Sequence, residues 1–118
     1  LVTRSTVPAL VGAASWAPTL RDTFTRSGAA TSLGALVVGP GMPFTAGAVS
    51  KTLQMPTVAA LEWDPPSAEV FSVGAQPRRK FENAGLSKSL RAAVQAIQAT
   101  LSSSRAAIDL AVGERSQP

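Results

Sequence analysis

The sequence predicts an α/β fold built on a partial parallel sheet of about three strands with crossover helices. Short apolar runs alternate along the chain with longer segments whose apolar residues recur every three or four positions. This strand–helix order is typical of parallel strands joined by crossovers. Because sheets usually have about four to six strands, we expect a single α/β domain over residues 1–112 that is part of a larger domain. Residues 113–118 are expected to form a frayed tail.

The first predicted unit is a buried strand at 1–3 followed by a helix. Ser5 and Thr6 are N-cap candidates for this helix, and Pro8 suits its first turn. Pro18 lacks a backbone N–H and clashes with the preceding turn, so we expect a kink or a break there. The apolar face of the helix consists of Leu10, Ala13, Ala14, Ala17, Leu20 and Phe24.

The second predicted unit is an apolar strand at 33–38 that ends at the turn 39–41. Residues 43–45 open a second helix, and the Met55-Pro56 pair stops it, because the residue before a proline is pushed out of the helical region. A third strand follows at 57–61. None of these strands alternates between apolar and polar residues, which is typical of sheets covered on both faces.

The last predicted unit begins with a rigid turn at 62–66 and a short helix at 67–73, with Gly74 as its C-cap. An irregular basic segment at 75–85 leads into a final amphipathic helix that can continue through Ile108. The apolar stripe of this helix is Leu86, Leu90, Ala93, Val94, Ile97 and Leu101.

Residue types that the chain lacks exclude much chemistry. The 118 residues include no Cys, no His and no Tyr, so thiol nucleophiles, imidazole bases and the usual transition-metal ligands are missing. The seven acidic residues show no pair with the spacing of a carboxylate metal loop. We therefore expect no independent catalysis. No apolar run approaches the roughly 18 residues that span a bilayer. Because the chain begins at Leu1 within a predicted strand, we expect a fragment or a processed product.

The first candidate binding loop is Gly39-Pro40-Gly41. It follows a buried strand at its carboxyl end, where open α/β sheets place their ligands. Glycine there lets a backbone approach a ligand closely. The alternative interpretation is a tight turn imposed by Pro40, since no complete phosphate-binding motif is present.

The second candidate loop is Asp64-Pro65-Pro66, which follows the third strand at the same edge of the sheet. Its carboxylate and stiff backbone suit a contact with a base or a sugar. Alternatively, Asp64 caps the short helix and Pro65 occupies the first helical turn. The two roles are compatible.

A basic surface forms the third candidate. Arg78, Arg79, Lys80, Lys88 and Arg91 fall within fourteen residues, in a chain of net charge +4. This pattern suits an acidic protein, nucleic acid or an anionic membrane surface as a partner. A solvated basic loop is the competing interpretation, because few aromatic residues are interleaved for base stacking.

The final helix also allows two interpretations. Its cationic side and apolar stripe suit a membrane interface or a partner helix. However, the stripe is narrow and rich in alanine, which favours ordinary packing against the sheet. Trp16 and Trp63 are interpreted as packing residues of the core or its edge.

Three segments together resemble the C-terminal half of MinD/ParA-like P-loop ATPases, in the divergent form found in high-GC bacteria. Residues 1–6 resemble a strand-to-helix step of that family, and residues 33–49 resemble its next strand, base-proximal loop and helix. Residues 53–65 resemble the following step, in which Trp63-Asp64-Pro65 ends the strand. The likeness covers most of residues 1–105 and is one of pattern, without an invariant catalytic motif.

The resemblance implies a Rossmann-like P-loop fold that binds ATP with Mg²⁺. It implies a homodimer or a protein partner, in DNA partitioning, cell division or the positioning of secretion machines. The expected location is the cytoplasm, peripheral to the membrane or the nucleoid. The loops 39–41 and 64–66 would be walls of the base pocket. Two departures stand out: the P-loop half is absent, and Gly39-Pro40 stands where many members place an adenine-reading Asn.

Three functions are thus open. The chain is the C-terminal part of such an ATPase, supplying base-side pocket walls and a partner surface while being catalytically silent alone. Alternatively, it is a non-enzymatic binding module that uses the basic loop 77–91. A stand-alone enzyme with a Ser or Lys nucleophile is the third option, and the missing residue types argue against it.

Overall fold

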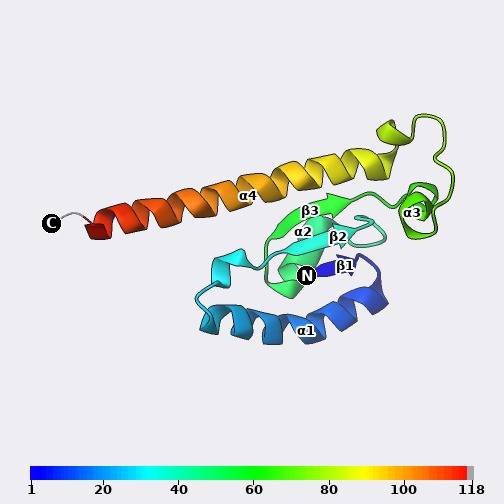
Figure 1. Ribbon diagram of the computed structural model, residues 1–118. Helices are drawn as coiled ribbons and strands as arrows, with labels where there is room; N and C mark the ends of the chain where they lie inside the picture. The colour runs from blue at the N-terminus through cyan, green and yellow to red at the C-terminus, as the bar shows by residue number, and fades with distance from the viewer. Residues whose placement is uncertain (117–118) are drawn as a thin grey trace.

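The computed structural model describes residues 1–116, and it shows a three-stranded parallel sheet (Figure 1). The strands are β1 (Val2–Arg4), β2 (Ala35–Val38) and β3 (Thr57–Leu61), in the order β1-β2-β3. Arg4 lies beside Val38, and Val38 beside Leu61, so all three strands end at one edge. The predicted α/β class with a partial parallel sheet is confirmed.

Four α-helices follow the strands within the described residues. They are α1 (Val7–Arg26), α2 (Ala46–Leu53), α3 (Pro65–Ser72) and α4 (Gly85–Ser116), with short 3-10 turns η1 (Ala30–Ser32) and η2 (Phe81–Asn83). Helices α1 and α2 contact each other and the sheet, whereas α4 packs along β3. None of the helices in residues 1–116 combines the length and apolarity needed to cross a membrane.

Helix α1 starts as predicted and passes through Pro18 without a break. The Thr6 hydroxyl accepts a hydrogen bond from the Ala9 N–H at 3.4 Å, and Pro8 lies in the first turn. The expected break at Pro18 is wrong, because α1 continues to Arg26. Pro18 lies on the exposed side of the helix. Water can therefore bind the carbonyl group that the missing N–H leaves without a partner.

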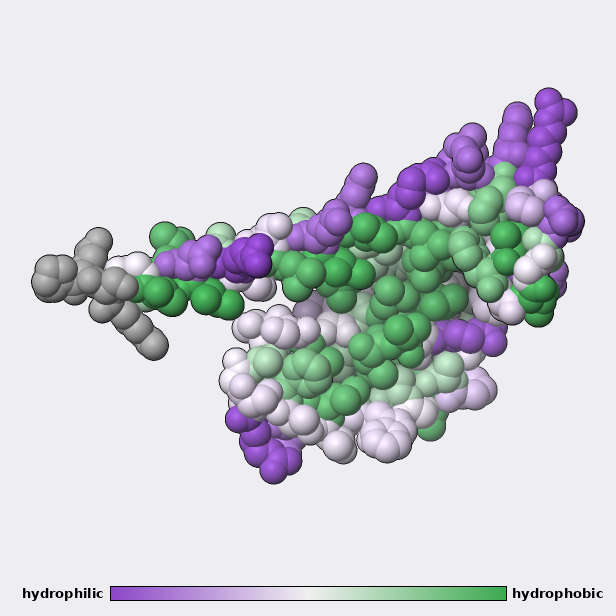
Figure 2. Space-filling model, in the orientation of Figure 1, coloured by the Kyte–Doolittle hydropathy of each residue, from purple (hydrophilic) through white to green (hydrophobic). Residues whose placement is uncertain are grey.

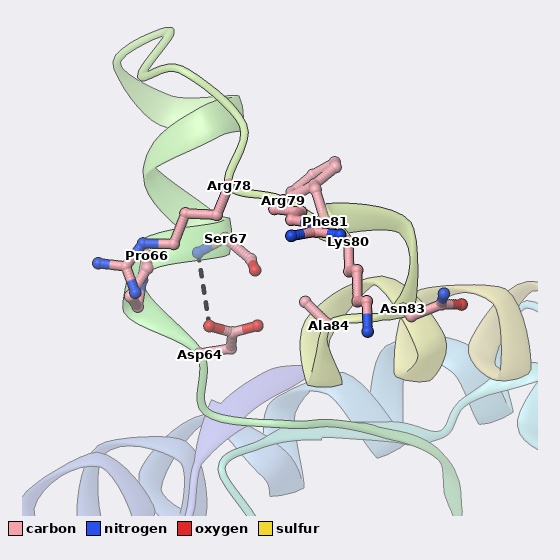
Figure 3. Close-up of a pocket in the computed structure, with 9 residues that line it drawn as sticks. All are labelled: Asp64, Pro66, Ser67, Arg78, Arg79, Lys80, Phe81, Asn83 and Ala84. Carbon is pink, nitrogen blue, oxygen red and sulfur yellow. Dashed lines mark hydrogen bonds between the residues drawn. The ribbon is translucent and has the colours of Figure 1, made fainter.

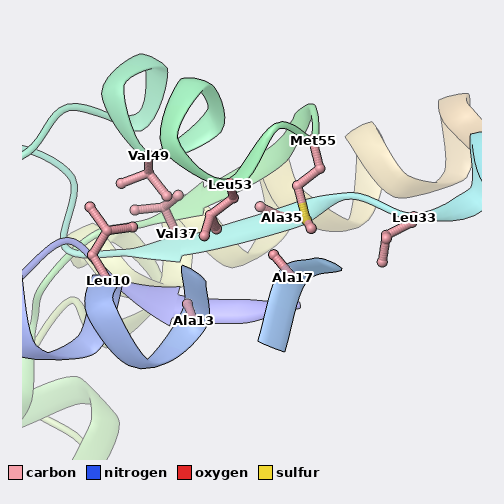
Figure 4. Close-up of a cluster of buried hydrophobic side chains, with 9 residues drawn as sticks. All are labelled: Leu10, Ala13, Ala17, Leu33, Ala35, Val37, Val49, Leu53 and Met55. Atoms are coloured by element: carbon pink, nitrogen blue, oxygen red, sulfur yellow. The ribbon is translucent and has the colours of Figure 1, made fainter. Parts of the chain in front are cut away.

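The hydrophobic core lies between the sheet and the α1–α2 layer. It consists of Leu10, Ala13, Ala17, Leu33, Ala35, Val37, Val49, Leu53 and Met55 (Figure 4). In β2, Ala35 and Val37 are fully buried in this core, while Leu36 and Val38 point the other way and are half-buried. The side chains of one face of β2 thus hold the core together.

The opposite face of the sheet is uncovered at β1. Val2 of β1 is 67% exposed, and Arg4 is exposed beside it. In Figure 1, α2 lies behind the strands, and Figure 2 shows apolar side chains over the near face and along the adjoining side of α4. Helix α4 covers this face along β3, whereas the β1 side is open. The expectation of a sheet covered on both faces is therefore met only in part for residues 1–116.

Helix α4 is much longer than its contact with the sheet. Leu86 and Ala93 are buried against the sheet side, whereas Leu101 is 63% exposed. The chain has a radius of gyration of 17.3 Å and a longest extent of 61 Å, against about 13.5 Å for the radius of a compact chain of this length. The predicted packing of the apolar stripe on the sheet is thus confirmed only for its first half. The helix includes residues 113–116 of the expected frayed tail, and residues 117–118 lie outside the described part.

Candidate functional site

The carboxyl edge of the sheet gathers most of the residues that the sequence singles out. Because the strands are parallel, the loops after β1, β2 and β3 meet at this edge. The loop after β2 contains Gly39, Pro40 and Gly41. The loop after β3 contains Trp63 and Asp64, and Pro65 and Pro66 form the first turn of α3. The predicted neighbourhood of the two candidate loops is therefore present.

A buried serine fixes the loop after β2. Ser5, only 1% exposed, follows β1, and its hydroxyl donates a hydrogen bond to the Gly39 carbonyl. The same hydroxyl accepts a hydrogen bond from the Met42 N–H at 3.0 Å. One side chain thus satisfies two backbone groups of the loop and ties it to the neighbouring strand.

The backbone N–H groups of this loop are used within the protein. Gly39 donates to the Leu61 carbonyl at 2.8 Å and Gly41 to the Phe44 carbonyl at 2.7 Å. The Phe44 N–H donates to the Ser5 carbonyl at 3.3 Å, and Pro40 and Pro43 have no N–H. A phosphate cradle needs several free N–H donors. The loop therefore cannot serve as one, and it offers a ligand only side chains and carbonyl groups.

Those side chains line a hollow of about 550 Å³ at the edge of the sheet. Its walls are Gly39, Pro40, Met42, Ala60, Glu62, Trp63 and Ser89. Gly39 has a φ of +71°, and a Cβ atom there would lie 3.3 Å from Met42 Sδ and 3.4 Å from Trp63 Cβ. Glycine is thus needed both for the backbone conformation and for the close approach of the two walls.

Trp63 forms the aromatic wall of the hollow, and the cationic side chain of Arg4 stacks on its ring. The guanidinium carbon of Arg4 lies 4.3 Å from the centroid of the Trp63 ring, within the range of a cation–π interaction. Trp63 is 42% exposed, so part of its ring remains accessible. Neither residue was a predicted site residue. The sequence does show a cation at the last position of β1, at the binding edge of the sheet. Its contact with Trp63 could not be predicted, because β2 lies between β1 and β3 and the contact depends on the fold.

Asp64 connects two helices. Its carboxylate accepts hydrogen bonds from the Ser67 N–H at 3.5 Å, at the start of α3, and from the Leu86 N–H at 3.2 Å, at the start of α4. The predicted cap of the short helix is confirmed, with α3 starting at Pro65 rather than at Ser67. Hydrogen bonding from Ser67, then from the Leu86 N–H, holds the pKa of Asp64 below its ordinary value, and the charge of Arg78 lowers the pKa further.

Asp64 also borders a basic pocket of about 330 Å³. Figure 3 shows Asp64, Pro66 and Ser67 on one side and Arg78, Arg79 and Lys80 on the other, with the Arg78 side chain reaching back toward Pro66. The structure thus joins two candidate sites that the sequence analysis kept apart. Lys80 has a φ of 62°, which turns the chain into η2.

Four predicted residues lie outside these two pockets. Pro65 lines a separate pocket with Trp63, Asp64 and Leu86. Gly41, with a φ of +85°, has open space around its Cα. Lys88 is exposed on α4, and Arg91 donates a hydrogen bond to the Glu82 carbonyl at 2.7 Å. The basic surface is therefore split between the pocket residues Arg78, Arg79 and Lys80 and the two cations on the helix.

The residues present fit part of the nucleotide that the resemblance implies. Among the side chains of residues 1–113, no three acidic groups come together as a cation site. The loop after β2 does not fit phosphate, as its donors are used internally. The aromatic and proline walls fit a planar base.

Comparison of the chain with known proteins found no matching family model, no matching curated protein and no matching solved structure.

Proposed function

We propose that this chain is the C-terminal part of a MinD/ParA-like ATPase, in which it supplies the base-side wall of the nucleotide pocket and a partner surface. It does not hydrolyse ATP by itself, and the phosphate-binding groups and Mg²⁺ ligands come from outside these residues. The protein acts in the cytoplasm, at the surface of the membrane or the nucleoid.

The observation that carries this proposal is the chemistry of the hollow at the carboxyl edge. Its walls combine the partly exposed Trp63 side chain with Pro40 and Met42, and the backbone donors of the loop after β2 are already occupied. Such a hollow suits a flat, uncharged ring, which stacks on an indole. It does not suit a phosphate group, which needs donors. The proposal requires this chain to contact the base while residues outside it bind the phosphates, and the hollow has the properties of such a base-side wall.

Arg4 extends the same site. Its guanidinium group lies over Trp63, and it forms no ion pair within 4 Å among the described residues, where Arg26–Asp22 is the one such pair. A guanidinium group can remain stacked on an aromatic ring while its N–H groups bind an anion. We therefore propose that Arg4 binds the sugar or an anionic group of a nucleotide whose base stacks on Trp63.

The fluorescence of Trp63 tests the proposal. The chain has two tryptophans, so Trp16→Phe leaves Trp63 as the one indole emitter. Titration of this variant with adenosine is expected to quench the emission saturably, because the base stacks on the ring. The matched variant Trp63→Phe, which keeps the exposed Trp16, is expected to show no saturable change. Equal responses of the two variants, or no response at millimolar adenosine, would contradict the proposal.

A second candidate function rests on the basic pocket. Arg78, Arg79 and Lys80 line it and have no carboxylate within 4 Å among the side chains of residues 1–113. We propose, as the alternative, a non-enzymatic module that holds an acidic protein, nucleic acid or a lipid surface here. Its affinity would fall steeply with rising salt. Replacing the three cations by Ala would abolish binding of a DNA duplex, whereas Lys51→Ala, an exposed cation on α2, would not.

A further inference from the structure

The outer half of α4 carries an apolar stripe that the described part of the chain leaves in solvent. Val94 is 53% exposed, Ile97 39%, Leu101 63% and Ile108 63%. Helix α4 packs mainly against β3, with smaller contacts to η2 and α3, and beyond Ala93 no residue through Gly113 is buried. Figure 2 shows apolar side chains exposed along the outer part of α4, next to hydrophilic ones.

A stripe of this kind is costly for an isolated helix. A helical segment of about 12–15 residues is marginally stable in water, and most helical stability comes from burying an apolar face. The segment from Ile97 to Gly113 is only slightly longer than this, and none of its residues is buried. Its apolar residues are large and regularly spaced, unlike scattered surface residues, which need no explanation. The stripe therefore needs a partner.

We infer that a second copy of this chain covers the stripe, in an antiparallel pair of α4 helices. The stripe positions 90, 94, 97, 101, 104 and 108 follow the alternating four- and three-residue spacing that is typical of a coiled-coil seam. This spacing is the same in both chain directions, with its centre at residue 99. Two copies related by a two-fold axis there match Ile97 with Leu101 and the smaller Val94 with Ser104, while Ile108 comes level with the half-buried Leu90.

Charge and shape favour the antiparallel over the parallel arrangement. The basic residues Arg78, Arg79 and Lys80 lie just before α4, and Lys88 and Arg91 lie in its first turns. A parallel pair would bring the two basic clusters and the two sheets together at one end. An antiparallel pair places them at opposite ends of the long axis and sets the helix dipoles head to tail.

The flank of the stripe is compatible with this arrangement. In the antiparallel pair, Arg91 on this flank lies opposite position 107 of the second copy. Asp109 of that copy is two residues away, or about 3 Å along the helix axis. Arg105 lies on the same flank, so the charges there partly cancel and the affinity must come mainly from the stripe. Two stripes facing each other would cover on the order of 1,000 Å², the lower bound of a specific interface.

Sedimentation equilibrium of the full chain tests the inference. A reversible dimer is expected at tens of micromolar, and Leu101→Asp should weaken it at least tenfold because a buried carboxylate replaces an apolar contact. Leu110→Asp is the matched control. Leu110 is 71% exposed and lies nine residues, or about half a rotation, from Leu101, so this variant should dimerise like the parent chain.

Cysteine pairing tests the orientation, since the chain has no native cysteine. Oxidation of a mixture of Val94→Cys and Ser104→Cys chains should give mainly the mixed disulfide. A parent chain that stays monomeric at 200 µM, equal effects of the two Asp variants, or disulfides only between identical chains would overturn the inference. Binding of a monomeric chain to phosphatidylglycerol vesicles without self-association would also overturn it, and would assign the stripe to a lipid surface.

Discussion

At the scale of single residues, two polar side chains organise the carboxyl edge. Ser5 holds the loop after β2 through its hydroxyl, and Asp64 caps α3 and α4 at once. Each therefore connects segments that are distant in sequence. The base-side wall depends on both, because Gly39 and Trp63 border the hollow and lie next to these anchors.

Replacing Asp64 by Ala should destabilise the protein in a way that depends on pH. The lowered pKa means that the folded state favours the ionised carboxylate. The ionised Asp64 carboxylate therefore stabilises the folded state above the ordinary pKa of about 3.9. This stabilisation is lost as the pH falls through the lowered pKa. The melting temperature of Asp64→Ala should be several degrees below that of the parent at pH 7, and the difference should shrink below about pH 3.9.

Asp22→Ala is the control for this prediction. Asp22 pairs with Arg26 on the exposed side of α1, and such surface pairs contribute little. A difference between Asp64→Ala and the parent that stays constant down to pH 2.5 would show that the carboxylate is not the stabilising group.

Ser5→Ala should lower the free energy of unfolding by about 1–3 kcal/mol, because it leaves the Gly39 carbonyl and the Met42 N–H without their buried partner. Urea denaturation measures the change. Ser15→Ala is the matched control, since the Ser15 hydroxyl donates to the Gly12 carbonyl on the exposed side of α1. Its effect should stay within about 0.5 kcal/mol. Equal losses for both variants would exclude an anchoring role for Ser5.

At the scale of elements, the sequence predicted the strands and most helix starts to within one or two residues. The periodic apolar residues and the caps Thr6 and Thr45 carry that information locally. Proline has more than one role, and this limited the prediction at two places. Of the two interpretations of Pro65, the first turn of α3 is the one confirmed. Pro18 was expected to break α1, although its exposed position tolerates the lost hydrogen bond.

Pro18→Ala should therefore stabilise α1. The new N–H can donate to the carbonyl four residues earlier, and the free energy of unfolding should rise by about 1–3 kcal/mol. Pro8→Ala is the control, because the first turn has no intrahelical acceptor for that N–H, and its stability should stay within about 0.5 kcal/mol of the parent. Thermal unfolding followed by circular dichroism measures both. A loss of stability in Pro18→Ala would mean that α1 needs the proline.

At the scale of the whole molecule, the chain covers one face of its sheet with α1 and α2 and the other only along β3, leaving the β1 side open. Unalternating strands could not show this, because a face buried by a partner and a face buried within the chain select the same apolar residues. The parallel order did predict that the loops at Gly39 and Asp64 share an edge. The Arg4–Trp63 contact and the joining of Asp64 with the basic segment were beyond the sequence, because both depend on how side chains meet across strands.

The central claim is that the hollow at Pro40, Met42 and Trp63 is a base-side wall, and ¹H–¹⁵N NMR of the labelled chain during an adenosine titration tests it most directly. The account predicts shifts of the Gly39 and Met42 amides and of the Trp63 indole N–H, with the Trp16 indole N–H unchanged. Tripolyphosphate should leave these signals in place and shift those of Arg78, Arg79 and Lys80. If adenosine shifts no signal around the hollow, or if the shifts are confined to the basic pocket, the claim is contradicted and the chain is better described as an anion-binding module.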